Sequence, residues 1–451
     1  MSLMSPARTS EDLRAHNRAR LLRTVHDQGA SLTRAQLTEL LGMARGTASV
    51  LVAELAEANL LTENPTEQLG RGRPSQVPGP HPAGPIALTI ALREDGWELA
   101  ATELGGATTS LGDFEHDRVL RNIFTDIATE LERCRDRYGS RLIGTGISVA
   151  GPVRNGQLVL TSQNIDGSES AERSWMRAVE DDARRDGGKA GAPTIATPGT
   201  AGSGVSGPSG PTRQPDHDRS RPSWHQIDVN QWLRPGDPAI HLANDATLAA
   251  LAEARRGQLR GTDFALHLHV DFGVGGCLVH DGRPIIGAHG IAGEFGHMRL
   301  TGGDESCPCG AIGCWGQQVG VMPLLRDYGV DSGYRDGRLQ ARRLLELAES
   351  GEPRARQALD RNARALGSGI GGLVNAHDPQ LVTLSGMGTA LLTTAADSLS
   401  DAYLSSLMTY HRTDPPALIA ADLGPRGPLL GAAELVFDAF LTPEGIERFG
   451  R

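Results

Sequence analysis

Apolar residues recur with a helical period at the start of the chain and with a strand-like period further on. From Glu11 to Gly29, and again across residues 31–63, they fall about every three or four positions, with Gly42 as a break. This spacing predicts three helices, the last two forming a helix-turn-helix, and a wing over Leu60–Leu69. The residues expected in the core of this segment are Leu13, Ala15, Leu21, Leu22, Val25, Leu37, Leu40, Leu41, Val50, Leu51, Leu55 and Leu60.

The second helix of a helix-turn-helix enters the major groove of DNA, so its outward side chains are candidates for reading bases. Near the start of this helix they are Arg45, Thr47 and Ser49. Arg can contact guanine through two hydrogen bonds, and Thr or Ser can contact bases or phosphates. Ala44 offers no side-chain acceptor at the N-cap position. The segment is therefore predicted to bind DNA; the alternative is a three-helix module that binds another protein.

A Gly-Arg-Gly-Arg-Pro-Ser run follows the predicted wing. Pro74 keeps it extended, and an extended strip carrying Arg71 and Arg73 is narrow enough for the minor groove. A solvated hinge between domains is the other interpretation. Residues 1–80 hold nine Arg and no Lys against eight acidic residues, whereas the whole chain has a net charge of −10. This asymmetry favours contact with DNA through the N-terminal part alone.

Beyond residue 85 the pattern changes to strand pairs followed by helices, and it does so twice. Hairpins are predicted at 86–106 and 264–285, each followed by helices and a buried strand, which indicates an α/β body. A final helix is expected to close on the first lobe. The predicted divisions are a disordered start at 1–10, a DNA-binding domain at 11–69, a linker at 70–84, a first lobe at 85–245 and a second lobe at 246–451.

Residues 166–222 interrupt the first lobe. Gly, Pro, Ser and Thr dominate most of this stretch, and large apolar residues are nearly lacking. Such a segment buries too little apolar surface to offset the loss of chain entropy on folding. It is predicted to be a disordered insertion in a surface loop.

Composition indicates a globular protein, since 39% of its residues are hydrophobic, with an aliphatic core because only 4% are aromatic. No run of 18 apolar residues is present, so no membrane span is expected. The chain opens without a charged and apolar leader, which predicts a cytoplasmic protein. Five cysteines fit a reducing compartment, and Cys134 and Cys277 are expected to be buried apolar residues.

One stretch brings metal-ligand chemistry together, because His297 is followed by Cys307, Cys309 and Cys314. An imidazole and three thiolates are ligands that Zn²⁺ prefers, and four of them close a tetrahedral site. Pro and Gly residues between the thiols allow the backbone to turn tightly. A closed site leaves no position for a catalytic water, so the zinc is predicted to be structural. The alternative is a loop with incidental cysteines.

The segments GAHGIAGEFGHM at 287–298 and CPCGAIGCW at 307–315 resemble the signature of the ROK family of bacterial sugar kinases and sugar-responsive repressors. The resemblance implies a two-lobed, actin-like, sugar kinase-like body behind an N-terminal winged helix-turn-helix. It also implies that Glu294 and His297 face sugar hydroxyls, that His297 ligates zinc, and that Asp245 stands at the position of the catalytic base. Asn244 would then hydrogen-bond the sugar, although Asn or Asp at a helix start is also an ordinary cap.

The chain departs from the kinase pattern where phosphate is bound. Aligned on the family's Asp-x-Gly loop, Ala91 takes the place of the Asp and Arg93 that of the Gly. After the last zinc cysteine the family has a sugar-binding Glu, where this chain has Gly316 and then Gln317. We therefore expect no kinase activity, but a repressor that binds double-stranded operator DNA, responds to a sugar or sugar derivative, and forms a homodimer or homotetramer. The alternatives are an ATP-dependent sugar kinase that carries a DNA-binding domain and a repressor without a ligand.

Overall fold

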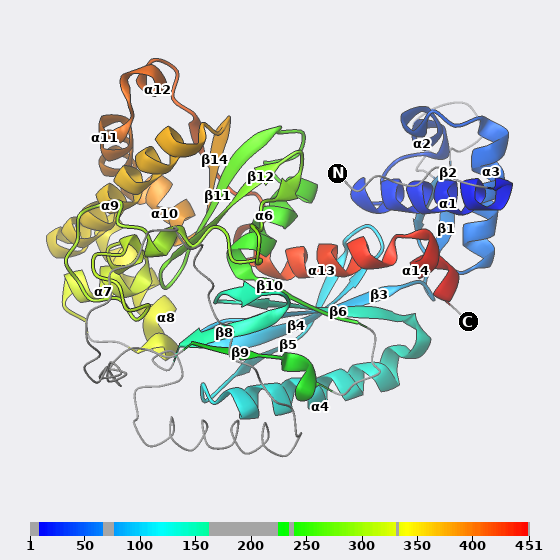
Figure 1. Ribbon diagram of the computed structural model, residues 1–451, viewed down its shortest axis with the longest axis horizontal. Helices are drawn as coiled ribbons and strands as arrows, with labels where there is room; N and C mark the ends of the chain where they lie inside the picture. The colour runs from blue at the N-terminus through cyan, green and yellow to red at the C-terminus, as the bar shows by residue number, and fades with distance from the viewer. Residues whose placement is uncertain (1–8, 66–75, 162–223, 234–238, 331–332, 450–451) are drawn as a thin grey trace, which may run out of the picture.

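The structure, a computed structural model, describes residues 9–65, 76–161, 224–233, 239–330 and 333–449. A small N-terminal domain lies beside a body of two lobes, and each lobe is built on a five-stranded sheet (Figure 1). Arg71, Arg73 and the insertion predicted at 166–222 lie outside the described residues. Among the described helices, none has the length and apolar character needed to cross a bilayer.

Three helices and a two-stranded antiparallel sheet form the N-terminal domain. They are α1 (Ser10–Asp27), α2 (Arg34–Leu41), α3 (Arg45–Glu57), β1 (Leu61–Pro65) and β2 (Gln76–Pro80). Thr33 caps α2 by accepting a hydrogen bond from the Gln36 amide, and Gly42 ends the helix in the left-handed region. Strand β1 lies within the range Leu60–Leu69 predicted as a wing, whereas its partner β2 lies in the range 70–84 predicted as a linker.

Three of the residues expected in the core of this domain are exposed. Leu13, Leu40 and Val50 are 52%, 59% and 51% accessible. The buried residues of α1 begin only at Ala19, so Leu13 lies ahead of the packed part of the helix. Leu40 and Val50 lie outside the buried stripes of α2 and α3, since a helix of this kind buries only one face. The prediction was wrong at these three positions.

The core of the N-terminal domain is continuous with that of the body. Leu21 and Leu22 of α1 belong to one buried cluster with Phe437 and Phe440 of α13 (Gly427–Phe440). Ile446 of α14 (Pro443–Arg448) joins the same cluster. In Figure 1, α13 and α14 run along the side of the first lobe that faces the N-terminal domain. Buried apolar contacts of this kind hold the domain in a defined position against the body.

The first lobe has the strand order β10-β6-β3-β4-β5. The strands are β3 (Ile86–Leu92), β4 (Gly96–Glu103), β5 (Thr108–Glu115), β6 (Leu142–Val149) and β10 (Ile240–Asn244). A smaller sheet beside them contains β7 (Val153–Arg154), β8 (Gln157–Thr161) and β9 (Trp224–Ile227). Helix α4 (Leu120–Tyr138) covers one face of the large sheet and α13 the other.

Small residues on the face toward α13 let this helix approach closely. Ile86, Leu88 and Ile90 of β3 pack in the cluster that contains α4, whereas Ala91 packs against Leu429 of α13. In β6, a Cβ atom at position 146 would lie 2.2 Å from a backbone oxygen of α13, so only glycine fits there. The final helix therefore lies directly on the first sheet.

The second lobe repeats the topology of the first, with the strand order β13-β12-β11-β14-β15. In each sheet the two pairings on one side of the sheet are antiparallel and the two on the other side are parallel, as in two-lobed actin-like ATPases. The strands are β11 (Phe264–Val270), β12 (Val274–His280), β13 (Arg283–Pro284), β14 (Leu381–Gly386) and β15 (Ala417–Ala420). The helices are α6 (Asp245–Arg256), α7 (Val321–Tyr328), α8 (Tyr334–Glu349), α9 (Pro353–His377), α10 (Met387–Thr394), α11 (Ala396–Ser406) and α12 (Thr409–Thr413).

Candidate functional site

The four predicted metal ligands come together on the long loop between β13 and α7. The ring nitrogen of His297 and the sulfurs of Cys307, Cys309 and Cys314 all lie within 4.8 Å of one another. Cys307 Sγ is 3.5 Å from His297 Nδ1, and Cys309 Sγ is 3.6 Å from Cys314 Sγ. Ligands about 2.0–2.3 Å from a tetrahedral Zn²⁺ are separated from each other by about 3.5–3.8 Å. The arrangement therefore fits a zinc ion held by all four residues.

Tight turns and one buried aromatic side chain shape this loop. The Gly310 amide donates a hydrogen bond to the Cys307 carbonyl at 2.9 Å, and Gly313 adopts a φ of 75° next to the last cysteine. Trp315 is fully buried, and its indole Nε1 donates to the Ala365 carbonyl of α9 at 2.8 Å. The candidate metal site is thus anchored to the helical layer of the second lobe.

His297 connects the cysteine cluster to the carboxyl groups of the cleft. Its Nδ1 faces Cys307, while its Nε2 lies 3.8 Å from Oε2 of Glu294. Burial, with the nearby charge of Asp245, raises the pKa of Glu294 to about 7. Burial also raises the pKa of Asp245. The structure therefore brings Glu294, His297 and Asp245 together.

Asn244 serves as a helix cap and retains capacity to bind a ligand. Its Oδ1 accepts a hydrogen bond from the Thr247 amide at 3.2 Å, and its Nδ2 donates to the Gly151 carbonyl at 3.1 Å. The first contact starts α6, and the second ties this helix to the Gly-Pro turn after β6. An amide side chain has two donor hydrogens and two acceptor lone pairs, so one of each remains.

Gln317, which follows the last cysteine of the cluster, contacts that cluster. Its Nε2 is directed at Cys307 Sγ, 3.6 Å away, and its backbone carbonyl accepts a hydrogen bond from Arg326. Its side chain therefore supports the cysteine cluster. The same residue lines a pocket between the two lobes.

The end of β3 and the turn between β3 and β4 contain the positions that the sequence aligned with the family's Asp-x-Gly loop. Ala91 is buried in an apolar cluster with Leu429 and Ala100. Arg93 ion-pairs with Asp113 at 2.8 Å and has Asp95 at 3.6 Å. The turn between β3 and β4 is consequently held by charged side chains.

Sequence reasoning missed a guanidinium that bridges the two lobes. Arg338 of α8 ion-pairs with Asp271, with Nε 3.0 Å from Oδ1. The same group ion-pairs with Asp95 and lies 3.4 Å from Glu94, both on the turn between β3 and β4. Burial and the charges of Asp271 and Asp245 raise the pKa of Glu94 to about 8, although Arg338 opposes this shift. Adjacent acidic residues in the turn Arg-Glu-Asp-Gly at 93–96 were the available sequence signal.

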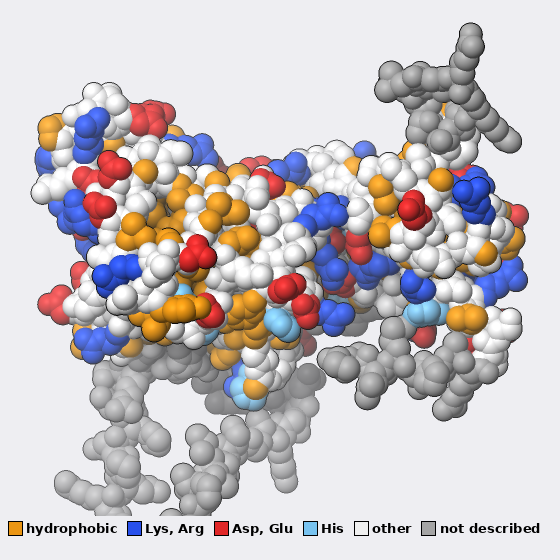
Figure 2. Space-filling view, turned by 90° about the horizontal axis from the view of Figure 1, so that it is seen from above, with side chains coloured by type: hydrophobic (Ala, Val, Ile, Leu, Met, Phe, Trp, Pro, Cys, Tyr) orange, Lys and Arg blue, Asp and Glu red, His pale blue; other side chains and the backbone are white. Residues whose placement is uncertain are grey.

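The candidate DNA-reading residues lie at the start of α3. Arg45 and Thr47 are exposed, whereas Ser49 is half-buried and accepts a hydrogen bond from Arg34 at 3.3 Å. Arg34 also ion-pairs with Glu63 of β1, which ties the helix-turn-helix to the strand pair. The N-cap residue of α3 makes no side-chain hydrogen bond, as an alanine there predicts. Figure 2 shows basic side chains on the part of the molecule that contains this domain, at the right of the view.

A buried ionic network joins the N-terminal domain to the body. His26 of α1 is fully buried, with Nδ1 accepting from the Gly105 amide at 3.0 Å and Nε2 lying 3.2 Å from Glu434 of α13. Arg256 of α6 donates to the same carboxylate at 2.5 Å. Burial raises the pKa of Glu434, but the hydrogen bonds and charges of His26 and Arg256 outweigh it and lower the pKa to about 2.

Comparisons with known proteins agree with this architecture. An N-acetyl-D-glucosamine kinase of Citrobacter koseri is 33% identical over 209 residues, covering 44% of this chain and 67% of the kinase. A crystal structure of a ROK family transcriptional regulator, a homologue of the MLC protein of E. coli, aligns with a TM-score of 0.64 and 19% identity over 96% of this chain and 99% of that chain.

A ROK family glucokinase from Streptomyces griseus, solved with glucose and AMPPNP, aligns with a TM-score of 0.57 and 20% identity over 78% of this chain and 98% of that chain. At these identities the two solved structures show a shared fold. They support the two-lobed actin-like body, and the regulator extends the likeness to nearly the whole chain. The sequence profile of the ROK family matches residues 197–439, which is more than half of the 451 residues. The chain therefore belongs to the ROK family.

Proposed function

We propose that this protein is a DNA-binding transcriptional repressor whose kinase-like body binds a sugar or sugar derivative without phosphorylating it. The observation that carries the proposal is the position of Arg338. Its guanidinium links the β3–β4 turn of one lobe to the β11–β12 turn of the other, where related kinases hold nucleotide phosphates. Asp95 and Asp271 place two carboxylates at this position, which repel a triphosphate.

The effector site that we propose consists of Asn244, Asp245, Glu294 and His297. Carboxyl, amide and imidazole groups on one side of the interlobe cleft suit a ligand with several hydroxyl groups. Zinc bound by His297 and the three cysteines would hold this side of the cleft in shape without taking part in a reaction. A ligand that favours one lobe arrangement would change DNA affinity through its differential affinity for the two arrangements.

The DNA-binding surface that we propose is α3 with the β1–β2 pair. Arg45 and Thr47 are accessible at the first turn of α3, and Arg71 and Arg73 belong to the sequence that connects the two strands. A single short helix reads few base pairs, so we propose a homodimer or homotetramer on an inverted-repeat operator. The likeness to a ROK transcriptional regulator over 96% of the chain supports this assignment.

A sugar kinase is the second candidate. It is supported by the 33% identity to N-acetyl-D-glucosamine kinase and by the meeting of Asp245 with Glu294 in the cleft. In that reaction Asp245 would take the proton from a sugar hydroxyl that attacks the nucleotide. The apolar surroundings of Ala91 and the bridge made by Arg338 argue against kinase activity.

A ligand screen with two readouts separates the candidates. Thermal unfolding is measured with glucose, N-acetylglucosamine and related sugars, with and without MgATP, and ADP release is measured in the same samples. We expect one sugar to raise the melting temperature without MgATP, because ligands that bind only the folded state stabilise it. We expect no sugar-dependent ADP release. Release that Asp245→Asn abolishes would establish the kinase instead, and a screen without any shift would favour the ligand-independent repressor.

A further inference from the structure

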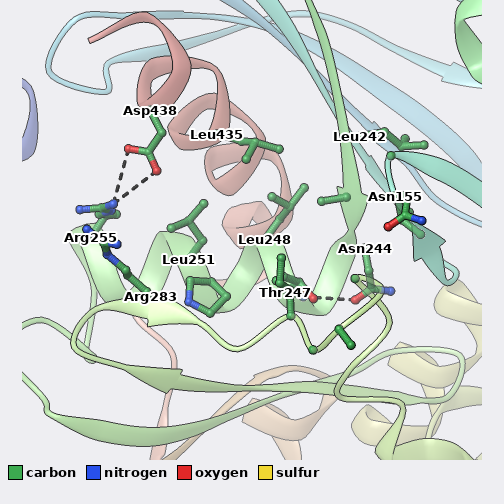
Figure 3. Close-up of a pocket in the computed structure, with 18 of the residues that line it drawn as sticks. Asn155, Leu242, Asn244, Thr247, Leu248, Leu251, Arg255, Arg283, Leu435 and Asp438 are labelled. Carbon is green, nitrogen blue, oxygen red and sulfur yellow. Dashed lines mark hydrogen bonds and ion pairs between the residues drawn. The ribbon is translucent and has the colours of Figure 1, made fainter. Parts of the chain in front are cut away.

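A cavity of about 770 Å³ lies where the N-terminal domain meets the body (Figure 3). It is formed by α1, the β7–β8 turn, β10 with α6, the loop after β13, and α13. Of the four residues of the proposed sugar site, Asn244 lines this cavity, whereas Asp245, Glu294 and His297 do not, so the cavity adjoins that site without containing its carboxyl and imidazole groups. Its volume lies within the range of about 300–1,000 Å³ that is usual for small-molecule sites.

The middle of the cavity is apolar. In Figure 3, Leu248 and Leu251 of α6 face the space below α13, which contributes Leu435. Leu242 of β10 and Ile286 of the loop after β13 extend the apolar surface. Walls of this kind favour a hydrocarbon or aromatic body over a free sugar, because a sugar would leave hydroxyl groups without partners.

One end of the cavity carries an excess of positive charge. Three arginines, Arg23, Arg255 and Arg283, line this end with two carboxylates, Asp27 and Asp438. Asp438 accepts from Arg23 at 2.5 Å and from Arg255 at 3.3 Å. Arg283 makes no ion pair with any residue in the described ranges. The net charge at this end of the cavity is therefore +1 when both carboxyl groups are ionised.

Two buried polar atoms at this end lack hydrogen-bond partners within the described chain. They are Nε of Arg255 and Oδ1 of Asp27. A buried donor without a partner is costly, and an anionic acceptor at this position would satisfy it. Burial raises the pKa of Asp27.

We infer that this cavity is a binding site for an organic monoanion with an apolar body, such as an aliphatic carboxylate. The carboxylate lies between Arg283 and Arg255, and the hydrocarbon body lies along Leu248, Leu251 and Leu435. This site is additional to the proposed sugar site, and its occupation does not depend on the protein binding DNA.

Binding at this site bears directly on α1. Arg255 shares Asp438 with Arg23, and Arg23 also donates to the Phe437 carbonyl at 3.3 Å. An anion that engages Arg255 competes with Asp438 for it, and so changes the ionic contacts that hold α1 on α13. Because the two equilibria are linked, anion binding then changes the position of the N-terminal domain, and that position changes the affinity for the anion.

The test uses the full-length protein and sodium octanoate, decanoate and dodecanoate, with decanol and decylamine as uncharged and cationic controls. Dissociation constants are measured by isothermal titration calorimetry. We expect the carboxylates to bind about 3–4-fold more tightly for each added methylene group, and decanol at least about 10-fold more weakly than decanoate. Equal binding of decanoate, decanol and decylamine, or no binding of any carboxylate, would overturn the assignment.

Two substitutions at exposed positions locate the ligand without threatening the fold. Arg283→Gln removes the unpaired charge, and Ala288→Trp places a large side chain at the rim of the cavity. Each should weaken decanoate binding at least about 10-fold, whereas Arg343→Gln, on an exposed face of α8, should leave it unchanged. If Arg283→Gln and Ala288→Trp both bind decanoate like the original protein, the anion binds elsewhere and the inference is wrong.

Hydrogen exchange tests the link to α1. Saturating decanoate should change the exchange rates of amides in α1 (Ser10–Asp27), and this change should disappear in Ala288→Trp. Unchanged exchange in α1, with binding intact, would disprove the coupling. The proposed repressor function is tested separately by DNA binding, so failure of either proposal can be recognised without the other.

Discussion

Arg338 of the second lobe ion-pairs with Asp95 of the first, across 243 positions of sequence. The guanidinium also pairs with Asp271 of its own lobe, so one side chain joins the two turns that face each other across the cleft. This contact holds the lobes together by an internal cation.

Arg338→Ala should destabilise the protein by about 2–4 kcal/mol, because the partly buried carboxylates of Asp95 and Asp271 lose their shared cation. Thermal or urea unfolding monitored by circular dichroism measures the change. Arg335→Ala is the matched control, because Arg335 lies on the same helix but pairs with Glu115 at a highly exposed site. Exposed pairs contribute about 0–1 kcal/mol. Equal losses in the two variants would argue against a structural role for the bridge.

The stability of the protein should fall as the pH rises through the neutral range. The folded state raises the pKa of Glu94 from 4.5 to about 8, so it holds this proton more tightly than the unfolded chain does. The stabilisation is complete below pH 4.5 and is lost progressively up to about pH 8. Melting temperatures between pH 5 and 9 should show this slope. Glu94→Gln should flatten the dependence of the melting temperature on pH, whereas Glu115→Gln, at an exposed site, should leave it unchanged. If Glu94→Gln keeps the original slope, Glu94 is not the group that causes it.

Purified protein should contain one zinc ion per chain, and Cys309→Ser should lose it. A structural zinc site contributes about 10–16 kcal/mol of apparent binding free energy, so the variant should also melt at a lower temperature. Metal content is measured by mass spectrometry after gel filtration. Cys134→Ser provides the comparison, because this cysteine is buried in the first lobe away from the cluster. Retention of zinc by Cys309→Ser would remove Cys309 from the ligand set.

Arg45→Ala should weaken operator binding by about 1–3 kcal/mol and relax the preference at one base pair of each half-site. The operator is first obtained by selection from random DNA, and affinities are then compared by fluorescence anisotropy. The selected sites should be inverted repeats with half-sites about 34–36 Å apart. Arg121→Ala, an exposed substitution on α4, should leave the affinity for the operator unchanged. A loss of affinity that is uniform over all sequences would place Arg45 on a phosphate instead.

The sequence predicted the elements well where their signal is local. Asn244 and Asp245 were expected to end a strand and start a helix, and they do so because an Asn cap and a helical period are read within a few residues. The cysteine cluster was predictable for the same reason, since its ligands lie within 18 positions, from His297 to Cys314.

Long-range contacts and exposure could not be predicted in this way. Arg338 meets Asp95 only because the two lobes fold toward each other, and nothing near position 338 signals a partner so distant in sequence. Leu40 and Val50 have the apolar character of core residues, but the packing of α2 and α3 leaves them outside. The side of a helix that packs is decided by its neighbours in three dimensions, not by hydrophobicity alone.

The shared core of the N-terminal domain has a consequence for the order of folding during synthesis. Leu21 and Leu22 are made long before their partners Phe437 and Phe440, which lie more than 400 positions later in the chain. At about 5–20 residues per second, the first helices wait roughly 20–80 s for the side chains that complete their core. During that interval the nascent chain exposes an apolar face, so chaperone contact and proteolysis should concentrate there. The packed form of the N-terminal domain is expected to arise only after Phe437 and Phe440 have been made.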